Sequence, residues 1–158
     1  MKYLDHKVVF REVPDEIALA INISGCPVHC PGCHSSYLAG DIGEVLDESS
    51  LMTLIEASKG ITCVSFMGGD ADPLNVKRLS DWVHANYPAL KTCWYSGRGL
   101  DAAAPVLPSL DFVKVGPYVE EFGPLDSPST NQRFYRIDNS GPTPALEDWT
   151  KRFLRKIL

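Results

Sequence analysis

The sequence predicts an α/β fold in a single domain, built on a mainly parallel sheet. Short runs rich in Val and Ile alternate with segments of helical periodicity, a pattern typical of βαβ units. The chain has 158 residues, enough for one domain with its own hydrophobic core. A composition of 44% apolar and 22% charged residues, with a mean hydropathy of −0.09, is that of an ordinary globular protein.

The first elements expected are two strands, a helix and a third strand. "KVVFREV" (7–13) and "EIALAINI" (16–23) have the composition of strands and are candidates for a hairpin across residues 14–15. "SSLMTLIEASKG" (49–60) has apolar residues at helical spacing, with Asp47 or Ser49 as the N-cap and Gly60 as the stop. A buried strand, "ITCVSFM" (61–67), follows directly.

The middle of the chain continues the alternation. A helix is expected over 75–88, beginning at Asn75 as the cap and ending before Pro88. "KTCWYSG" (91–97) is expected to be a strand, "LDAAAPVL" (100–107) a short helix broken at Pro105, and "LDFVKVG" (110–116) another strand.

The last third begins with a long loop and is expected to end in a helix. Residues 116–134 are rich in Pro and Gly, and loops of this length are usually functional or disordered. A C-terminal helix over about 143–158 is predicted, with Thr143 as the cap and Pro144 in the first turn. One face of this helix would carry Leu146, Trp149, Phe153 and Ile157. The basic run "KRFLRK" is favourable at a helix C-terminus, and it also suits an acidic partner.

Four loops are predicted to meet at one edge of the sheet. Each follows a strand, and together they cover residues 25–34, 67–70, 95–98 and 115–118. Because chemistry in α/β folds gathers at the carboxyl ends of parallel strands, this convergence predicts a single active site.

Charge and hydropathy narrow the class of protein. A net charge of −5 and a pI near 5.3 argue against nucleic-acid binding, which needs a cationic surface. The first residues form no apolar signal segment, and no run approaches the roughly 20 apolar residues of a membrane span. We therefore expect a cytoplasmic protein that binds neither nucleic acid nor membrane.

The five cysteines fall into two groups. Cys26, Cys30 and Cys33 form a C-x3-C-x2-C cluster, which in a reducing cytosol indicates metal binding or catalysis rather than disulfides. Cys63 and Cys93 lie inside apolar strand-like runs and are expected to be packing residues.

Two kinds of metal site are compatible with the cysteine cluster. His29 or His34 would complete a Cys3His zinc site, but the sequence offers no second ligand pair. Iron–sulfur clusters normally take four thiolates, so three would leave one iron open for a non-protein ligand.

The cysteine loop, together with "MGGD" at 67–70, resembles the radical S-adenosylmethionine (SAM) enzymes. In those enzymes the open iron is chelated by the amino and carboxylate groups of SAM, and a glycine-rich motif contacts its methionine part. The resemblance implies a partial (incomplete) TIM-like β/α barrel, with residues 1–158 as a single radical SAM core domain.

The further stretches "CWYSGR", "LDFVKVGPYVEE" and "TNQRFY" make the chain similar to the anaerobic ribonucleoside-triphosphate reductase activating proteins. This resemblance implies a [4Fe–4S] cluster and SAM as cofactors. It implies reductive SAM cleavage to methionine and a 5′-deoxyadenosyl radical, which generates a glycyl radical on the anaerobic reductase. The implied electron donor is a flavodoxin or a ferredoxin.

The resemblance also implies the site residues. Cys26, Cys30 and Cys33 would ligate the cluster. The adenosine side of SAM would be bound by Gly32, Cys33 and His34, and the methionine side by Gly68, Gly69 and Asp70. Ser96 and Arg98 would contact SAM or form a strand-to-helix turn, and Lys114 would face the site or lie at a solvated strand end. No further catalytic residue is assigned.

The chain also departs from the family pattern. "REVPDE" replaces an Asn-Gly-Pro-Gly stretch, "SPSTNQR" lacks a Trp-Arg-Gly, and "GGDADPL" carries two extra residues. The alternative targets are another glycyl-radical enzyme of the pyruvate formate-lyase type and a small molecule. The alternative of another class is a non-catalytic zinc or iron–sulfur interaction module.

Overall fold

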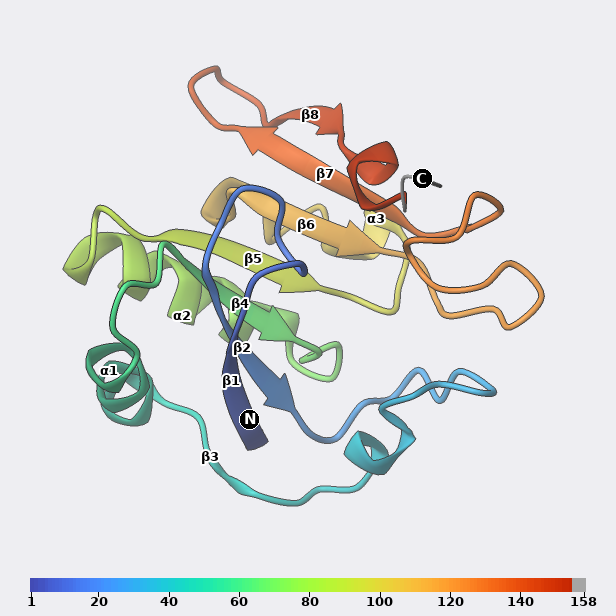
Figure 1. The fold of residues 1–158 in the computed structure, drawn as a ribbon. Helices are drawn as coiled ribbons and strands as arrows, with labels where there is room; N and C mark the ends of the chain where they lie inside the picture. Colours follow the sequence, from blue (N-terminus) through green and yellow to red (C-terminus); the bar gives the residue numbers. More distant parts are fainter. Residues whose placement is uncertain (155–158) are drawn as a thin grey trace.

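A computed structural model describes residues 1–154 as a mixed α/β domain built on one eight-stranded sheet (Figure 1). The strands are β1 (Lys2–Val9), β2 (Ala18–Ile23), β3 (Glu44–Val45), β4 (Cys63–Met67), β5 (Lys91–Tyr95), β6 (Phe112–Val115), β7 (Arg133–Asp138) and β8 (Ala145–Asp148). The α-helices are α1 (Glu48–Ala57), α2 (Pro73–Asn86) and α3 (Leu100–Ala103). Short 3₁₀ helices cover Ser36–Ala39, Leu107–Ser109 and Thr150–Phe153.

The strand order is β3-β1-β2-β4-β5-β6-β7-β8, and only the centre of the sheet is parallel. Three pairings, β2–β4, β4–β5 and β5–β6, are parallel. The four outer pairings are antiparallel. The expectation of a mainly parallel sheet is therefore wrong, because antiparallel connections add β1 and β3 at one edge and β7 and β8 at the other. The described residues form an open sheet with β3 and β8 at its two edges, and not the expected TIM-like barrel.

Side chains of alternate residues divide the core between the two faces of the sheet. On one face, Leu19, Ile21 and Trp94 pack with apolar residues of α1 and α2. On the other face, Ala18 and Ala20 pack with Cys63 and Cys93, and with residues from the β1–β2 connection and the C-terminal part. Both cysteines are fully buried, which confirms that they are packing residues.

The helix caps follow the sequence rules, with one correction. Asp47 caps α1 by accepting the N–H of Ser50, and Ser50 Oγ accepts the N–H of Asp47 in return. Asp72, rather than Asn75, caps α2, because Pro73 takes the first helical position.

The prediction of a C-terminal helix over 143–158 is wrong for the part of it that the structure describes. Residues 145–148 form β8, where Leu146 pairs with Ile137 of β7, and a 3₁₀ turn follows. Residues 155–158, and with them Ile157, lie outside the described residues. The long loop expected over 116–134 overlaps the start of β7, since Arg133 and Phe134 are the first two residues of that strand.

Candidate functional site

The cysteine loop leaves the carboxyl end of β2 and is shaped by its own backbone. Gly25, His29 and Gly32 have positive φ values of 75°, 52° and 74°. The N–H of Cys26 donates to Leu38 (3.1 Å), which ties the start of the loop to the segment that follows it. All three loop cysteines are free thiols of intermediate exposure.

Tyr118, from the segment after β6, lies against the cysteine loop. A Cβ placed on Gly32 would meet Tyr118 Cε1 at 3.5 Å and Glu120 Oε2 at 3.4 Å. The rings of His34 and Tyr118 pack at 5.6 Å between centroids. Two loops that are far apart in the sequence are therefore in contact at one end of the sheet (Figure 1).

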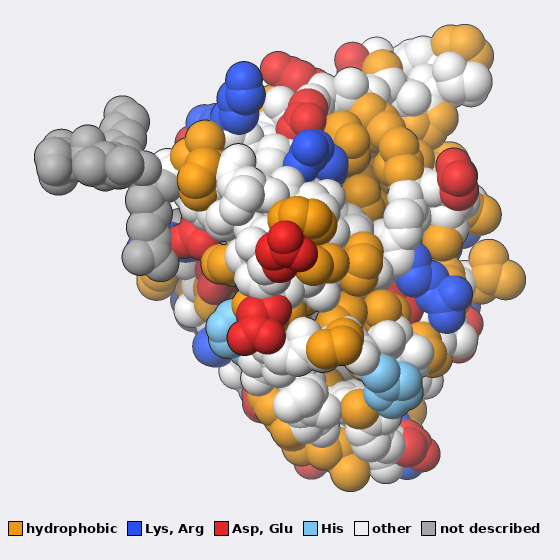
Figure 2. Space-filling view, turned by 90° about the vertical axis from the view of Figure 1, so that its right-hand side faces the viewer, with side chains coloured by type: hydrophobic (Ala, Val, Ile, Leu, Met, Phe, Trp, Pro, Cys, Tyr) orange, Lys and Arg blue, Asp and Glu red, His pale blue; other side chains and the backbone are white. Residues whose placement is uncertain are grey.

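These loops enclose a cavity of about 290 Å³, which we call the inner cavity. Figure 2 looks onto this end of the molecule and shows hydrophobic side chains in a band down the middle of the face, with acidic groups beside it. The predicted site residues that line the cavity are Cys26, Cys30, Cys33, His34, Gly68, Asp70 and Ser96. Convergence of the four loops, expected from the strand ends, is thus seen in the fold.

Gly32, Gly69 and Arg98 are not among the residues lining the cavity. Gly32 faces Tyr118 and Glu120, and Arg98 is exposed. Gly69 has φ +95°, and a Cβ there would lie 2.8 Å from Val76 Cγ2. Its position therefore requires glycine because α2 packs against it.

Gly68 is fixed by hydrogen bonds to the neighbouring strand β5. Its N–H donates to the carbonyl of Tyr95 (3.0 Å), and its carbonyl accepts Trp94 Nε1–H (2.8 Å). Gly68 has φ +105°, and a Cβ there would lie 3.1 Å from the carbonyl oxygen of Ile23, so this position at the wall of the cavity favours glycine.

Asp70 is buried, and its carboxylate is used inside the protein. One oxygen accepts the Ser96 hydroxyl and the other accepts the N–H of Gly97 at 2.9 Å. Ser96 Oγ in turn accepts the N–H of Arg98 at 3.0 Å. Asp70 thus joins the turn after β4 to the turn after β5.

Lys114 is buried in the wall of the cavity, so the alternative of a solvated strand end is wrong. Its ammonium donates to the carbonyl of Gly116 at 2.8 Å. Burial lowers the pKa of Lys114 to about 8. Negative charge on Cys30, Asp70 and Cys33 acts in the opposite direction. The site therefore holds a cation beside the cysteine thiols.

The arrangement of the thiols tests which metal group fits. Within residues 1–154, no three or more His, Cys, Asp and Glu side chains are gathered closely enough to hold one metal ion. A Cys3His zinc site with His29 or His34 is thus not formed. A four-iron cluster offers a separate iron to each thiolate, so three thiols spread along the wall of one cavity fit that group better.

Several further residues line the inner cavity that sequence reasoning did not select. Among them are Asn22, Met67, Tyr95, Tyr118 and Gln132. Gln132 belongs to the "TNQRFY" stretch, which was a signal of resemblance without an assigned role. Tyr95 is the residue before Ser96 at the end of β5.

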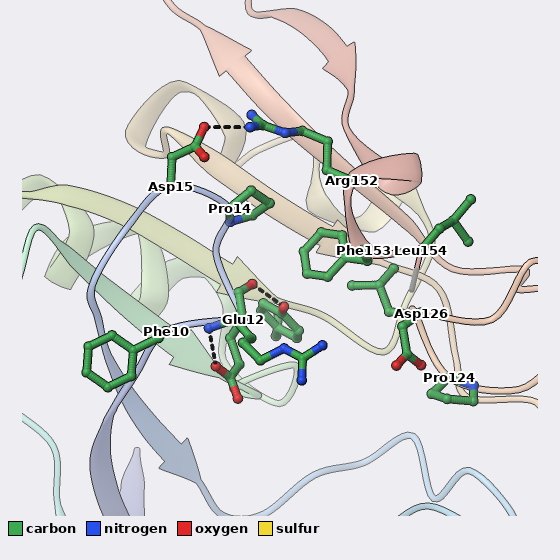
Figure 3. Close-up of a pocket in the computed structure, with 12 residues that line it drawn as sticks. Phe10, Glu12, Pro14, Asp15, Pro124, Asp126, Arg152, Phe153 and Leu154 are labelled. Atoms are coloured by element: carbon green, nitrogen blue, oxygen red, sulfur yellow. Dashed lines mark hydrogen bonds and ion pairs between the residues drawn. The ribbon is translucent and has the colours of Figure 1, made fainter. Parts of the chain in front are cut away.

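A second hollow of about 510 Å³, the outer cavity, adjoins the inner one (Figure 3). Both cavities are lined by Tyr95 and Pro124. The outer cavity lies between the β1–β2 connection and the C-terminal 3₁₀ turn, where Arg152 pairs with Asp15 at 2.7 Å.

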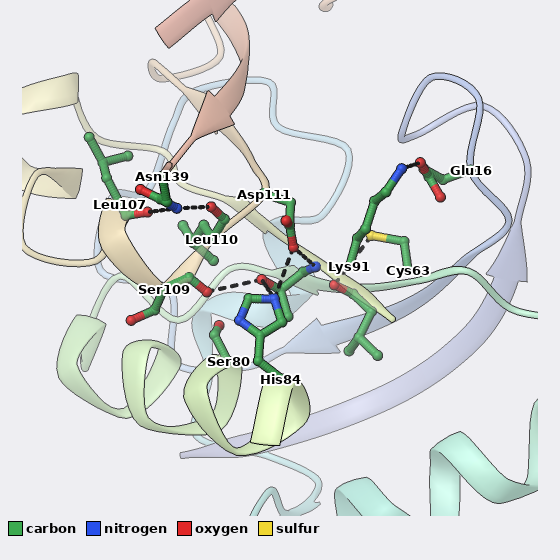
Figure 4. Close-up of polar contacts among 12 residues, drawn as sticks. Glu16, Cys63, Ser80, His84, Lys91, Leu107, Ser109, Leu110, Asp111 and Asn139 are labelled. Carbon is green, nitrogen blue, oxygen red and sulfur yellow. Dashed lines mark hydrogen bonds and ion pairs between the residues drawn. The ribbon is translucent and has the colours of Figure 1, made fainter. Parts of the chain in front are cut away.

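A polar cluster lies away from both cavities, near the start of β5 and β6 (Figure 4). His84 Nε2 of α2 contacts Asp111 Oδ2 at 2.9 Å, and the same carboxylate oxygen accepts the N–H of Thr92 at 2.8 Å. None of these residues lines either cavity, and the cluster fastens α2 to the sheet.

The chain was compared with known proteins. The model of a family described as the 4Fe–4S single cluster domain matches residues 17–134, more than half of the chain. No curated protein and no solved structure gives a significant match. Among the described residues, no helix has the length and apolar character needed to cross a membrane.

Proposed function

Because the chain belongs to the 4Fe–4S single cluster domain family, we propose that it is a radical SAM activating enzyme. This domain is found in radical SAM activases. The observation that carries the proposal is that three cysteines, not four, line one cavity together with Gly68 and Ser96. Three thiolates on a four-iron cluster leave one iron available to SAM.

In this proposal each part of the cavity has a distinct task. Cys26, Cys30 and Cys33 hold the cluster, and His34 lies on the adenosine side of SAM. Gly68 presents backbone to the methionine part.

Asp70 does not contact SAM in this scheme. Because both of its oxygens are bonded within the protein, it positions Ser96 and the backbone of the turn after β5. Lys114 supplies positive charge next to the thiolates, which lowers the cost of collecting negative charge in a buried site. Gly32 and Gly69 contribute outside the cavity, Gly32 through its φ of +74° and Gly69 through its packing against Val76.

A [4Fe–4S] cluster held by Cys26, Cys30 and Cys33 would supply the low-potential electron for reductive cleavage of SAM, the chemistry that would lead to hydrogen abstraction from a glycine. The substrate proposed is the anaerobic ribonucleoside-triphosphate reductase, with a flavodoxin or ferredoxin as electron donor, in the cytoplasm. The part of the sheet that would correspond to a partial barrel is the parallel centre, β2-β4-β5-β6.

The test is anaerobic reconstitution of the full chain with iron and sulfide, followed by reduction with SAM present. We expect a brown protein that forms methionine and 5′-deoxyadenosine. On addition of the reductase, we expect the electron paramagnetic resonance doublet of a glycyl radical. SAM cleavage without that doublet would indicate another target, such as a pyruvate formate-lyase type enzyme or a small molecule. A cluster that never cleaves SAM would identify a non-catalytic iron–sulfur module.

A further inference from the structure

Gln132 is a buried residue whose side-chain amide has no hydrogen-bond partner among residues 1–154. The residue is 6% exposed and lines the inner cavity. Its backbone is bonded, since its N–H donates to Thr130 Oγ1 (3.2 Å) and its carbonyl accepts Arg133 Nη1–H (2.8 Å). Its side chain makes no hydrogen bond to any other residue among 1–154.

The amide of Gln132 retains contact with open space. In the described part of the chain, Asn131 Oδ1 is the one side-chain nitrogen or oxygen atom that is fully buried and lacks a hydrogen-bond partner. The Gln132 amide, which is unbonded but not enclosed, therefore reaches the space of the cavity. Burying such a group without a partner is unfavourable, so a ligand that bonds to it would recover the lost hydrogen bonds.

Gln132 lies on the side of the cavity formed by β6 and β7. A Cβ on Gly116, at the end of β6, would lie 3.2 Å from Gln132 Cα. In the sheet, β4, β5 and β6 separate β7 from β2, whose end carries the cysteine loop. The residues proposed to bind SAM come from the loops after β2, β4 and β5. Gln132 comes from a different part of the chain, which has no proposed contact with SAM.

The same side of the inner cavity leads to the outer one. Pro124 and Tyr95 border both cavities, and the segment from Pro124 to Gln132 runs between β6 and β7. Figure 3 shows Pro124 and Asp126 at the rim of the outer cavity, across from Glu12. A polypeptide whose glycine occupies the inner cavity has a route for its flanking residues across this shared border.

We propose that the side-chain amide of Gln132 binds a main-chain peptide group of the partner polypeptide next to its target glycine. A primary amide has donors and an acceptor, which match the C=O and N–H of a peptide group, and it carries no charge that would select an ionic ligand. In a ligand-binding cavity, a small number of polar groups usually sets the orientation of the ligand. This inference rests on the proposed function, because it assumes that the substrate is a protein glycine. Gln132 is thus a positioning residue for substrate, distinct from the residues that hold SAM.

The test compares wild type with Gln132→Leu, which is similar in volume and lacks both hydrogen-bonding groups, and with Gln132→Glu, which keeps only the acceptor. The probes are the purified anaerobic reductase and SAM. We expect the KM for the reductase in glycyl-radical formation to rise about tenfold or more in Gln132→Leu, the loss typical of a hydrogen bond left unmade. A smaller rise is expected in Gln132→Glu. The Kd for SAM, measured by calorimetry, should stay within about twofold because the amide does not contact the cofactor.

Other outcomes overturn the inference. A Kd for SAM that rises as much as the KM would place the amide on the cofactor, for instance on its adenine. Unchanged KM and Kd would make Gln132 a structural residue. If wild type cleaves SAM but forms no radical on the reductase, the proposed function itself fails, and the substrate role of Gln132 fails with it. Thermal melting of both variants checks that the fold is kept, and Gln132→Glu preserves the test if Gln132→Leu does not fold.

Discussion

The carboxylate of Asp70 accepts the hydroxyl of Ser96, so the turns after β4 and β5 are joined inside the wall of the inner cavity. The second oxygen of the same carboxylate accepts the N–H of Gly97. A residue expected to contact SAM thus has each of its carboxylate oxygens hydrogen-bonded within the protein. Its effect on SAM would act through the shape of the cavity.

Asp70→Ala should lower both stability and SAM affinity. The change leaves the Ser96 hydroxyl and the Gly97 N–H without their buried partner, at a cost of about 2–3 kcal/mol in the free energy of unfolding. Urea denaturation measures the stability, and calorimetry with SAM measures the affinity. The control is Asp41→Ala, whose side chain is 77% exposed and whose removal should cost less than about 0.5 kcal/mol. Equal effects of the two variants would refute the bridging role.

Replacing any one of Cys26, Cys30 or Cys33 with Ala should abolish SAM cleavage, because the cluster loses a ligand. Iron and sulfide content and the visible absorbance of the reconstituted protein measure the cluster. The matched control is Cys63→Ala, which should keep the cluster and cost about 1–3 kcal/mol in packing energy. A Cys30→Ala protein that still cleaves SAM would show that the cluster is held elsewhere.

Gly69→Ala should destabilise the fold by about 2–3 kcal/mol, because φ +95° is strained for alanine and the new Cβ would lie 2.8 Å from Val76 Cγ2. Gly99→Ala is the matched control, since that glycine has φ −76° and no atom within 4 Å of the added Cβ. It should change stability by less than about 0.5 kcal/mol. Thermal or urea unfolding of both proteins provides the comparison. A Gly69→Ala protein as stable as Gly99→Ala would mean that α2 can shift at no cost.

The His84–Asp111 pair should make stability depend on pH. The hydrogen bond that the His84 ring donates to the Asp111 carboxylate raises the pKa of His84, against the effect of burial. Burial acts to raise the pKa of Asp111, but the bonds from His84 and the N–H of Thr92 outweigh it and lower the pKa overall. Stabilisation from His84 is fully present below its unfolded pKa of about 6.5 and is lost as pH rises through the higher folded value. Stabilisation from Asp111 is present above its unfolded pKa of about 3.9 and is lost in more acidic solution.

His84→Gln should therefore lose most stability relative to wild type between about pH 4 and 6.5, and the gap should narrow at alkaline pH. Urea denaturation at pH 5.5 and pH 9 tests this. A constant gap across that range would mean that the ion pair contributes nothing beyond packing.

The centre of the fold was predictable from sequence because its signals are local. The strands β2, β4, β5 and β6 are short apolar runs, and Asp47 caps α1 as expected. The helix ends at Ala57 with Ser58 as its C-cap, before Gly60, which was expected to be the stop. The three loop cysteines follow β2 as predicted, and they line a cavity with Gly68, the residue expected from the next strand end.

The C-terminal part was not predictable in the same way. Leu146, Trp149 and Phe153 have helical spacing, yet Leu146 pairs with Ile137 and the N–H of Trp149 donates to the carbonyl of Phe134. Long-range pairing with β7 overrides the local helical pattern. The strand β8 forms because it pairs with β7, and its own residues carry no strand pattern that could have predicted it. The position of Gln132 in the cavity depends on the same antiparallel return, so sequence reasoning missed it.

The burial of Cys63 and Cys93 has a consequence for how the protein is assembled. Burial raises the pKa of both thiols, which keeps them protonated and poor at binding iron or reacting with oxidants. The native protein therefore offers iron and alkylating reagents three of its five cysteine thiols. Once folded, the chain can load its metal without competition from its own interior, and damage by air would begin at the loop that carries the chemistry.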